Sequence, residues 1–317
     1  MSRCLVLGGG LLGAHTAVAL RAEGHEVTVF SRSFSAWLRA HHAHDGMRLV
    51  VGDLGSPPAL GQLVHEAEVV FYLAGSSTPE IAAHSVVASA NGSLLPALHG
   101  LDAMRAAGTR KIVLSSSGGT VYGRVERVPT PEDHPTEPIS IHGLTSLALE
   151  RYAYFFARLH SFEPVVLRYA NVYGPGQRTR GGQGVIAAWF DALAAGIPIT
   201  MIGDGSVRRD FLYAGDAAQA AVHAAFSVQG SGLFNVGAHS SVALSELLEL
   251  MQEITGLRAG MHTVADRGID VPVTQLDSSR IEGQTGWRPR TSLRDGLEAS
   301  WAWMSERRQR RGPHASR

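Results

Sequence analysis

Three glycines near the start of the chain have the spacing of an anion-binding turn. Gly8, Gly10 and Gly13 come directly after a short apolar run at residues 3–7. Gly8 would allow a tight turn, Gly10 would let the backbone approach a ligand, and Gly13 would let a helix pack closely on a strand. The N–H groups of the first helical turn would then face a negative charge. This spacing is typical of turns that bind the pyrophosphate of a dinucleotide.

The elements that must position this turn can also be predicted. Residues 14–23 have the pattern of a helix that ends at Gly24, and residues 25–30 have the β-branched and aromatic positions of a strand. Together with residues 3–7 they form a strand, glycine turn, helix and second strand. This βαβ order is the context in which the glycine spacing predicts dinucleotide binding.

The end of the second strand bears on the choice of dinucleotide. Proteins selective for NAD usually place Asp or Glu there, against the 2′-hydroxyl of the adenosine ribose. This chain has Ser31 and Arg32 instead, and Arg32 could pair with a 2′-phosphate. The residues favour NADP, while an exposed arginine can also be a bystander. Asp53, after the strand at 49–51, is expected to meet the adenine amine.

Further strands are expected at 69–73 and 111–114. The first ends in small residues that leave room for a cofactor, and the second ends in the hydroxyls of residues 115–117. Ligands of open α/β sheets bind at the carboxyl ends of the strands. We therefore expect the cofactor to be held by Gly8, Gly10, Leu11, Leu12, Gly13, Ser31, Arg32, Asp53, Leu54, Leu73, Ala74, Gly75, Ser115 and Tyr169.

The composition narrows the function classes. The chain has 317 residues, enough for a large α/β core, and it carries 28 basic and 28 acidic residues. This balance gives no reason to expect nucleic acid or a membrane as a partner, and no apolar run approaches the ~20 residues of a membrane span. The first apolar run is too short for a signal peptide, and a single cysteine, Cys4, suits a reducing cytoplasm. We expect a cytoplasmic protein.

Histidines 41, 42 and 44 and Asp45 could suggest a metal site. Adjacent histidines in a polar loop point in different directions, and no partner motif is visible. We expect no metal.

The rest of the chain continues the α/β pattern. Helices are expected at 81–107, 143–160, 185–195 and 245–255, with others starting at Asp216 and Leu293. Strands are expected at 164–167 and 197–202. Residues 307–317 are basic and lack apolar periodicity, and we expect them to be a disordered tail.

Taken together, these motifs resemble the extended short-chain dehydrogenase/reductase family, of the NAD-dependent sugar-nucleotide epimerase and dehydratase type. The resemblance covers almost the whole chain. It is carried by the glycine turn and by six further segments, at 52–54, 115–123, 171–176, 209–211, 235–237 and 286–289.

The resemblance implies a Rossmann-type, doubly wound parallel sheet in an α/β fold, with a smaller discontinuous C-terminal substrate lobe. The NAD(P)-binding domain would comprise residues 1–172 and 207–238, and the lobe residues 173–206 and 239–306. It further implies a nucleoside-diphosphate sugar as ligand and a homodimer formed through a bundle that includes helix 143–160. The substrate contacts would come from Asn171, Val185, Arg209, Arg267 and Asp270.

The chain departs from the family at its catalytic pair. In the family, a tyrosine and a lysine four residues apart begin the helix after the proline-rich loop, and the lysine lowers the tyrosine pKa. Here these positions are His142 and Ser146, and the only lysine, Lys111, opens a strand at the wrong end. Gly118 also stands where many relatives have a catalytic Ser or Thr, with Ser117 and Thr120 nearby.

Three interpretations remain open. The chain could be an active isomerase that uses His142, because an imidazole titrates at ~6.5 without help from a lysine. Ser146 could then hydrogen-bond the ribose, and Ser117 or Thr120 could orient the substrate hydroxyl. Alternatively, it could be a pseudoenzyme that binds NAD(P) or a sugar nucleotide without turnover. The third possibility is a different reaction, such as that of a dehydratase, decarboxylase or reductase, on a related ligand.

Overall fold

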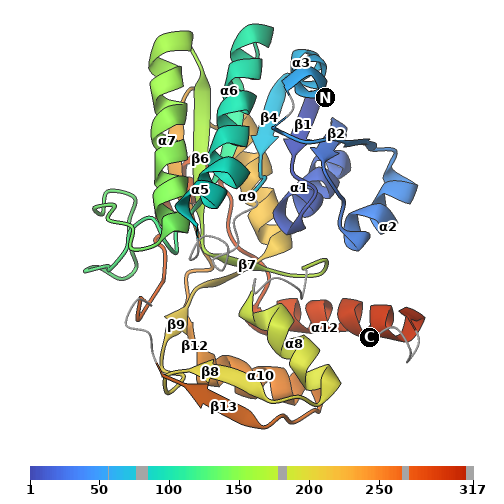
Figure 1. Ribbon diagram of the computed structural model, residues 1–317, viewed down its shortest axis with the longest axis vertical. Coiled ribbons are helices and arrows are strands. Elements are labelled where there is room, and N and C mark those ends of the chain that lie inside the picture. The colour runs from blue at the N-terminus through green and yellow to red at the C-terminus, as the bar shows by residue number, and fades with distance from the viewer. Residues whose placement is uncertain (56, 76–84, 178–183, 266–270, 312–317) are drawn as a thin grey trace.

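The larger part of the molecule, called the sheet half below, is built around a parallel sheet of seven strands (Figure 1). The computed structural model describes residues 1–55, 57–75, 85–177, 184–265 and 271–311. The strand order is β11-β6-β5-β4-β1-β2-β3, so the direction of winding reverses between β1 and β4. The strands are β1 (Arg3–Leu7), β2 (Glu26–Ser31), β3 (Arg48–Val51), β4 (Val69–Tyr72), β5 (Lys111–Ser117), β6 (Glu163–Tyr169) and β11 (Gly232–Val236).

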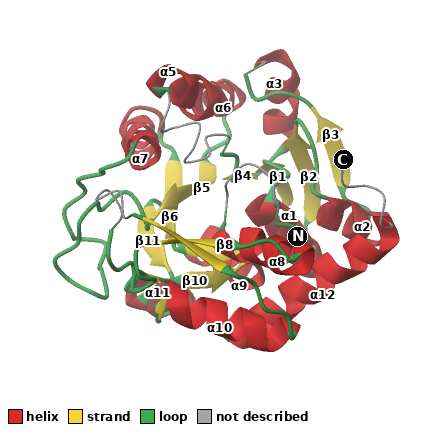
Figure 2. Ribbon diagram, turned by 60° about the horizontal axis from the view of Figure 1, so that its bottom comes forward, coloured by secondary structure: helices red, strands yellow, loops and turns green. Residues whose placement is uncertain are grey.

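Helices cover both faces of the sheet (Figure 2). Alternate residues of β1 point to opposite faces, so that Cys4 and Val6 join one buried cluster while Leu5 and Leu7 join another. The first cluster includes side chains of α1 (Leu11–Ala22), α2 (Ala36–Asp45), α9 (Ala214–Ser227) and α11 (Ser279–Thr285). The second face carries α3 (Pro57–Glu66), α5 (Val86–Ser89), the π-helical turn η1 (Ala90–Leu94), α6 (Leu95–Ala107) and α7 (Ile141–His160).

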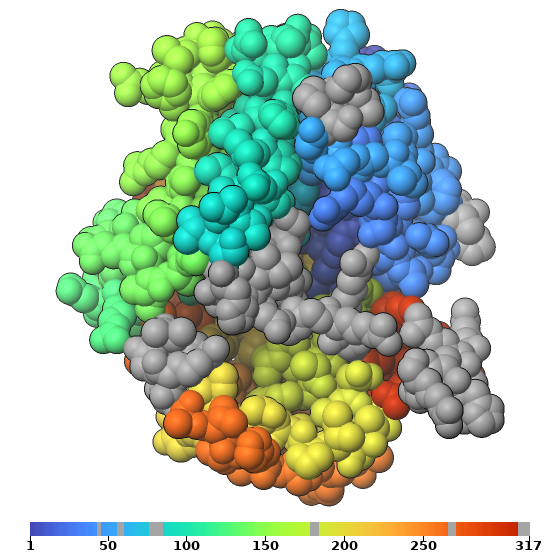
Figure 3. All heavy atoms as spheres, viewed as in Figure 1, coloured from blue at the N-terminus to red at the C-terminus, as the bar shows by residue number. Residues whose placement is uncertain are grey.

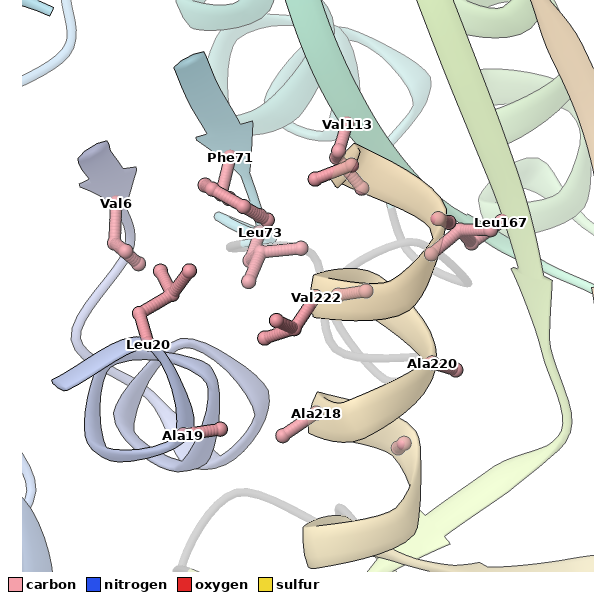
Figure 4. Close-up of a cluster of buried hydrophobic side chains, with 14 of the residues drawn as sticks. Val6, Ala19, Leu20, Phe71, Leu73, Val113, Leu167, Ala218, Ala220 and Val222 are labelled. Atoms are coloured by element: carbon pink, nitrogen blue, oxygen red, sulfur yellow. The ribbon is translucent and has the colours of Figure 1, made fainter. Parts of the chain in front are cut away.

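The first cluster shows why these segments pack as they do. Figure 4 shows Leu20 of α1 directed toward Val6 and Phe71 of the sheet, and Val222 of α9 directed toward Leu20 and Leu73. α9 is rich in alanine, and small side chains let it lie close to both α1 and the strands. A continuous apolar core of this kind fixes the carboxyl ends of the strands, where a ligand site would form.

A smaller lobe lies at the carboxyl ends of the strands, drawn in yellow to red below the sheet in Figure 1. Its core contains Trp189, Phe190, Leu247, Met251 and Leu297. The connection runs through β7 (Asn171–Tyr173), which pairs with β10 (Phe211–Tyr213). The lobe elements are α8 (Val185–Ala195), β8 (Ile199–Ile202), β9 (Arg208–Arg209), β12 (Val242–Ala243), α10 (Leu244–Thr255), β13 (Met261–Val264) and α12 (Leu293–Arg311).

The doubly wound parallel α/β fold is confirmed, and three local predictions need correction. The helix predicted at 81–107 is interrupted by η1, and residues 81–84 lie outside the described residues. α12 continues to Arg311, so the first five residues of the predicted tail are helical, and residues 312–317 are not described. Histidines 41 and 42 lie on α2 rather than in a loop. Within the described part of the chain, no helix is both long enough and apolar enough to cross a lipid bilayer.

Candidate active site

A large cleft lies between the strand ends and the lobe. It has a volume of about 870 Å³, near the upper end of the ~300–1,000 Å³ typical of ligand pockets. Its walls come from the glycine turn, the ends of β2 to β6, the start of α7, and α8 and β8 of the lobe. In Figure 3 the blue and green atoms of the sheet half lie above the yellow and orange atoms of the lobe. The cleft therefore occupies the switch point of the sheet, where ligands of this architecture bind.

The glycine turn has the backbone that its sequence predicts. Gly8 has φ +119°, and a Cβ there would come within 2.9 Å of the Ala74 backbone. A Cβ on Gly13 would overlap the carbonyl oxygen of Gly8, so α1 packs against the turn only because this position is glycine. A Cβ on Gly10 would meet no atom within 4 Å, and Gly10 lines the cleft.

The start of α1 is open to an anion. Gly10 is the N-cap and has no side chain to accept a hydrogen bond, so the first-turn N–H groups stay available. Leu11 and Leu12, which belong to this turn, line the cleft. The residues of this chain therefore fit the pyrophosphate of a dinucleotide.

His142 lies at the start of α7, inside the cleft lining. The Ser140 hydroxyl caps the helix by accepting a hydrogen bond from the Gly143 N–H at 3.1 Å. Burial lowers the pKa of His142 from its ordinary value, which favours the neutral imidazole. Its ring forms no hydrogen bond with any residue that the structure describes. A neutral imidazole with a free nitrogen can accept a proton from a ligand.

Gly143 brings α7 against the turn that follows β5. A Cβ at this position would lie 2.5 Å from the Thr120 carbonyl oxygen and 3.0 Å from Pro138. The Thr120 and Val121 N–H groups both donate hydrogen bonds to the Ser117 carbonyl and so close that turn. This close packing brings the helix that carries His142 onto the turn that carries Ser117, and both residues line the cleft.

The other hydroxyls near His142 are directed elsewhere. The Ser146 Oγ donates to the His142 carbonyl at 2.9 Å, and Ser146 does not line the cleft. The Thr120 Oγ1 is buried without a partner among the described residues, and Thr120 is also absent from the lining. A Cβ on Gly118 would lie 2.5 Å from Leu276, so a side chain there would enter the core.

On the lobe side, Asn171 and Arg209 are held by the junction between the two halves. The Asn171 Nδ2 donates to the Asp210 carbonyl at 3.1 Å. The Arg209 Nη1 donates to the Val271 carbonyl at 2.7 Å, which fixes the guanidinium at the cleft wall. Val185 begins α8 and also lines the cleft. Arg267 and Asp270 lie outside the described residues.

The cleft thus brings most of the predicted residues together. Besides those named above, the lining includes Ser31, Arg32, Asp53, Leu54, Leu73, Ala74, Gly75, Ser115 and Tyr169. Tyr169 is buried, and its hydroxyl donates to the Ala217 carbonyl at 3.2 Å. Gly13, Thr120 and Ser146 are not part of the lining.

Several lining residues have no counterpart in the sequence prediction. Asn91 and Gly92 lie on η1, Trp189 and Thr200 come from the lobe, and Phe211 begins β10 at the connection to the lobe. Asn91 and the neighbouring Gly92, inside a helical pattern, are the signal that could have marked η1, since π-helical turns are frequent at functional sites. The lobe residues carry no such signal, because their positions depend on how α8 and β8 pack.

His41 makes structural contacts, whereas the buried Nδ1 of His42 has no hydrogen-bond partner among the described residues. The His41 Nδ1 hydrogen-bonds the Trp37 carbonyl at 2.9 Å, and its ring packs on Trp37. Across the described residues no group of three His, Cys, Asp or Glu side chains is arranged to hold a metal ion. The side chains of His44 and Asp45 are outside that description.

Comparisons with known proteins agree with this geometry. A model of the NAD dependent epimerase/dehydratase family matches residues 4–237. The chain is 31% identical over 302 residues to a UDP-glucose 4-epimerase of Mycolicibacterium smegmatis, which covers 93% of this chain and 96% of that protein.

Solved structures resemble the whole fold. A UDP-glucose 4-epimerase from Thermotoga maritima with UDP-glucose is 29% identical, with a TM-score of 0.89, covering 96% of this chain and 99% of that one. The Thermus thermophilus UDP-glucose 4-epimerase in complex with NAD is 28% identical, with a TM-score of 0.87 and the same coverage. The chain belongs to the NAD dependent epimerase/dehydratase family.

Proposed function

We propose that the chain is an NAD(P)-dependent epimerase that acts on a nucleoside-diphosphate sugar through transient oxidation at a ring carbon, with His142 as its acid and base. One observation carries the proposal. The imidazole of His142, whose pKa is lowered by burial and which has no partner among the described residues, lines the same cleft as the glycine turn and Arg209. The relatives named above act on UDP-glucose, which supports a sugar nucleotide as the ligand.

The cofactor would occupy the sheet side of the cleft. The start of α1 would hold the pyrophosphate, and Leu73, Ala74 and Gly75 leave space beside it. Bound NAD(P) supplies a reversible hydride acceptor, which is the chemistry that oxidation of a sugar alcohol requires.

His142 would move the proton. Its neutral ring would accept the proton of a sugar hydroxyl and return it when the alcohol re-forms. Phenols titrate near ~10 and need a neighbouring cation to act as bases at neutral pH, whereas an imidazole titrates near ~6.5. In this proposal His142 takes the role of the family's tyrosine, Ser146 stands at the position of the lysine without its role, and no lysine is needed. The Ser117 hydroxyl, on the adjoining turn, would orient the sugar hydroxyl.

The lobe side would hold the sugar nucleotide. Arg209 would contact the diphosphate, because guanidinium groups bind phosphate oxygens in a planar, bidentate manner. Asn171 and Val185 would contact the sugar, and we propose the same diphosphate and sugar roles for Arg267 and Asp270.

A second candidate is a binding protein without turnover. It is favoured by the Ser146 hydroxyl, which is already bonded to the His142 carbonyl and leaves the base without a visible helper. Tight ligand binding without conversion of any sugar nucleotide would identify this case. A dehydratase, decarboxylase or reductase reaction would instead convert the sugar nucleotide to a product of different mass.

We also propose a homodimer. α7 exposes Leu144, Tyr152, Phe155 and Leu159, which are 41–58% accessible and repeat at helical spacing. α6 lies beside α7 (Figure 1), and with α5 it adds Leu95, Val86 and Val87 to this apolar surface. Exposed apolar side chains gathered on neighbouring helices are typical of a protein interface.

The experiment is direct. Mass spectrometry of the denatured, purified chain would identify any copurified dinucleotide. The chain would then be incubated with UDP-, GDP- and dTDP-sugars plus NAD or NADP, and the products separated by chromatography. Appearance of an epimer of equal mass, lost in His142→Phe, is the expected result. Conversion that persists in His142→Phe contradicts the proposed base, and binding without conversion favours the second candidate.

A further inference from the structure

The segment that follows β2 is fixed beside the glycine turn. The Gly8 N–H donates to the Phe30 carbonyl at 2.9 Å, and the Ser35 N–H donates to the Gly9 carbonyl at 3.0 Å. A Cβ on Gly9 would come within 2.8 Å of the Ser33 carbonyl oxygen and 3.1 Å of the Ser31 Cβ. Residues 31–33 therefore lie next to the pyrophosphate position, where the adenosine ribose of a dinucleotide follows.

This segment carries hydroxyls and a positive charge. Ser31, Arg32 and Ser33 all line the cleft. Arg32 is exposed, and among the described residues it forms no ion pair. An exposed guanidinium at the cleft wall is available to an anionic ligand, and phosphate is the anion that its planar set of donors fits best.

The group that would select an unphosphorylated ribose is not found in this segment. NAD-selective sites use a carboxylate at the end of the second strand to accept a hydrogen bond from the ribose 2′-hydroxyl. Among the described residues that line the cleft, only Asp53 has a carboxylate. Asp53 follows β3 instead, and its Oδ1 already accepts a hydrogen bond from the Gly55 N–H at 2.8 Å.

From these observations we infer that the adenosine end of the cleft recognises a 2′-phosphate, with Arg32 and the hydroxyls of Ser31 and Ser33 as its partners. The inference rests on the proposed function, because it assumes that a dinucleotide occupies the cleft. It makes NADP the preferred cofactor and Arg32 the residue that sets the preference. A carboxylate at position 31 would repel the same phosphate, so Ser31→Asp should reverse the preference for NADP.

Calorimetry on the full chain tests this without any turnover. NADPH, NADH, adenosine 2′,5′-bisphosphate and AMP would each be titrated into the unmodified chain and into Arg32→Ala, Ser31→Asp and Arg39→Ala. Arg39 is an exposed arginine of α2 outside the cleft lining, and its variant is the matched control.

NADPH should bind the unmodified chain about tenfold to a hundredfold more tightly than NADH, as expected for charge-assisted hydrogen bonds to phosphate. Arg32→Ala should remove most of that difference by weakening NADPH alone, and Ser31→Asp should invert it. Adenosine 2′,5′-bisphosphate should likewise bind more tightly than AMP, and Arg39→Ala should change neither preference.

Equal or tighter binding of NADH to the unmodified chain would overturn the inference and leave the proposed function standing. An Arg32→Ala variant that weakens NADPH and NADH equally would do the same. If none of the four ligands binds, the proposed use of a dinucleotide fails together with this inference.

Discussion

The Arg168 guanidinium and the Glu150 carboxylate form a buried bidentate ion pair. The Nε–Oε1 distance is 2.9 Å and the Nη2–Oε2 distance is 2.7 Å, and both side chains are at most 4% exposed. Glu150 lies on α7 and Arg168 on β6, while Ser116 of β5 donates to the same carboxylate. The pair and the Ser116 hydrogen bond therefore fix the helix that begins near His142 to two strands whose ends line the cleft.

Removing one member of this pair should strongly destabilise the fold. Glu150→Ala would leave the buried Arg168 charge without its carboxylate, at a cost of about 3–5 kcal/mol in the free energy of unfolding. Glu150→Gln should lose less, because the amide oxygen can still accept a hydrogen bond. Urea denaturation measures both.

The matched control for this prediction is an exposed pair. Asp191 accepts from Arg308 at 2.9 Å, with both side chains about half exposed. Asp191→Ala should change the unfolding midpoint little, since exposed ion pairs contribute weakly. If Glu150→Ala shifts the unfolding midpoint as little as Asp191→Ala does, the buried pair contributes little to stability.

His142→Phe should abolish turnover while leaving dinucleotide binding intact. A positioned acid or base contributes about 10²–10⁴-fold to a rate, so kcat should fall by at least about 100-fold. Progress curves with the sugar nucleotide measure kcat, and calorimetry measures cofactor affinity. His160→Phe, at the exposed end of the same helix, is the control and should keep full activity.

The pH profile should report the same imidazole. In the proposed mechanism the neutral form of His142 is the active one, and this form is lost when pH falls through the pKa of the group. Because burial lowers this pKa from 6.5, activity should persist below pH 6.5 and decline only in more acidic solution. The logarithm of kcat/KM measured against pH checks this. A profile that already declines above pH 7 as the solution is acidified would point to another group.

Alanine substitutions at two glycines of the turn should affect dinucleotide binding and fold stability separately. Gly10→Ala places a Cβ in open space at the cleft, so the fold should persist while dinucleotide binding weakens by about tenfold or more. Gly13→Ala forces α1 away from Gly8 and should lower the free energy of unfolding by about 1–3 kcal/mol.

Gly61 supplies the control for these two variants. It lies in the interior of α3, where a Cβ would meet no atom within 4 Å. Gly61→Ala should raise stability by about 0.5–1 kcal/mol, because alanine is the better helix former. A Gly13→Ala variant as stable as Gly61→Ala would contradict the close packing seen at Gly8.

Local patterns predicted most of the sheet half and the glycine turn. Strands such as β4 are short apolar runs, and the requirement for glycine at position 13 comes from a contact with Gly8, five residues before it. Patterns confined to residues close together in the sequence can be recognised from the residue types alone.

Long-range contacts could not be predicted in the same way. The Tyr122 hydroxyl donates to Asn235 at 2.7 Å and accepts from Arg168 at 3.0 Å, which joins residues more than 40 positions apart. Nothing in the spacing of these residues indicates that they meet. The direction of the Ser146 hydroxyl, toward the helix carbonyl rather than the cleft, likewise depends on its rotamer.

The apolar face of α7 gives a final prediction, on the proposed dimer. Phe155 is 53% exposed at the centre of the stripe, so Phe155→Glu would place two like charges in the interface of a symmetric dimer. The unmodified chain should sediment as a dimer and the variant as a monomer in analytical ultracentrifugation. Met261→Glu alters a residue of β13 that is 61% exposed in the lobe, and this control should remain dimeric. An unmodified chain that sediments as a monomer at micromolar concentration would leave α7 without its proposed partner, whereas a Phe155→Glu dimer would move the interface to another surface.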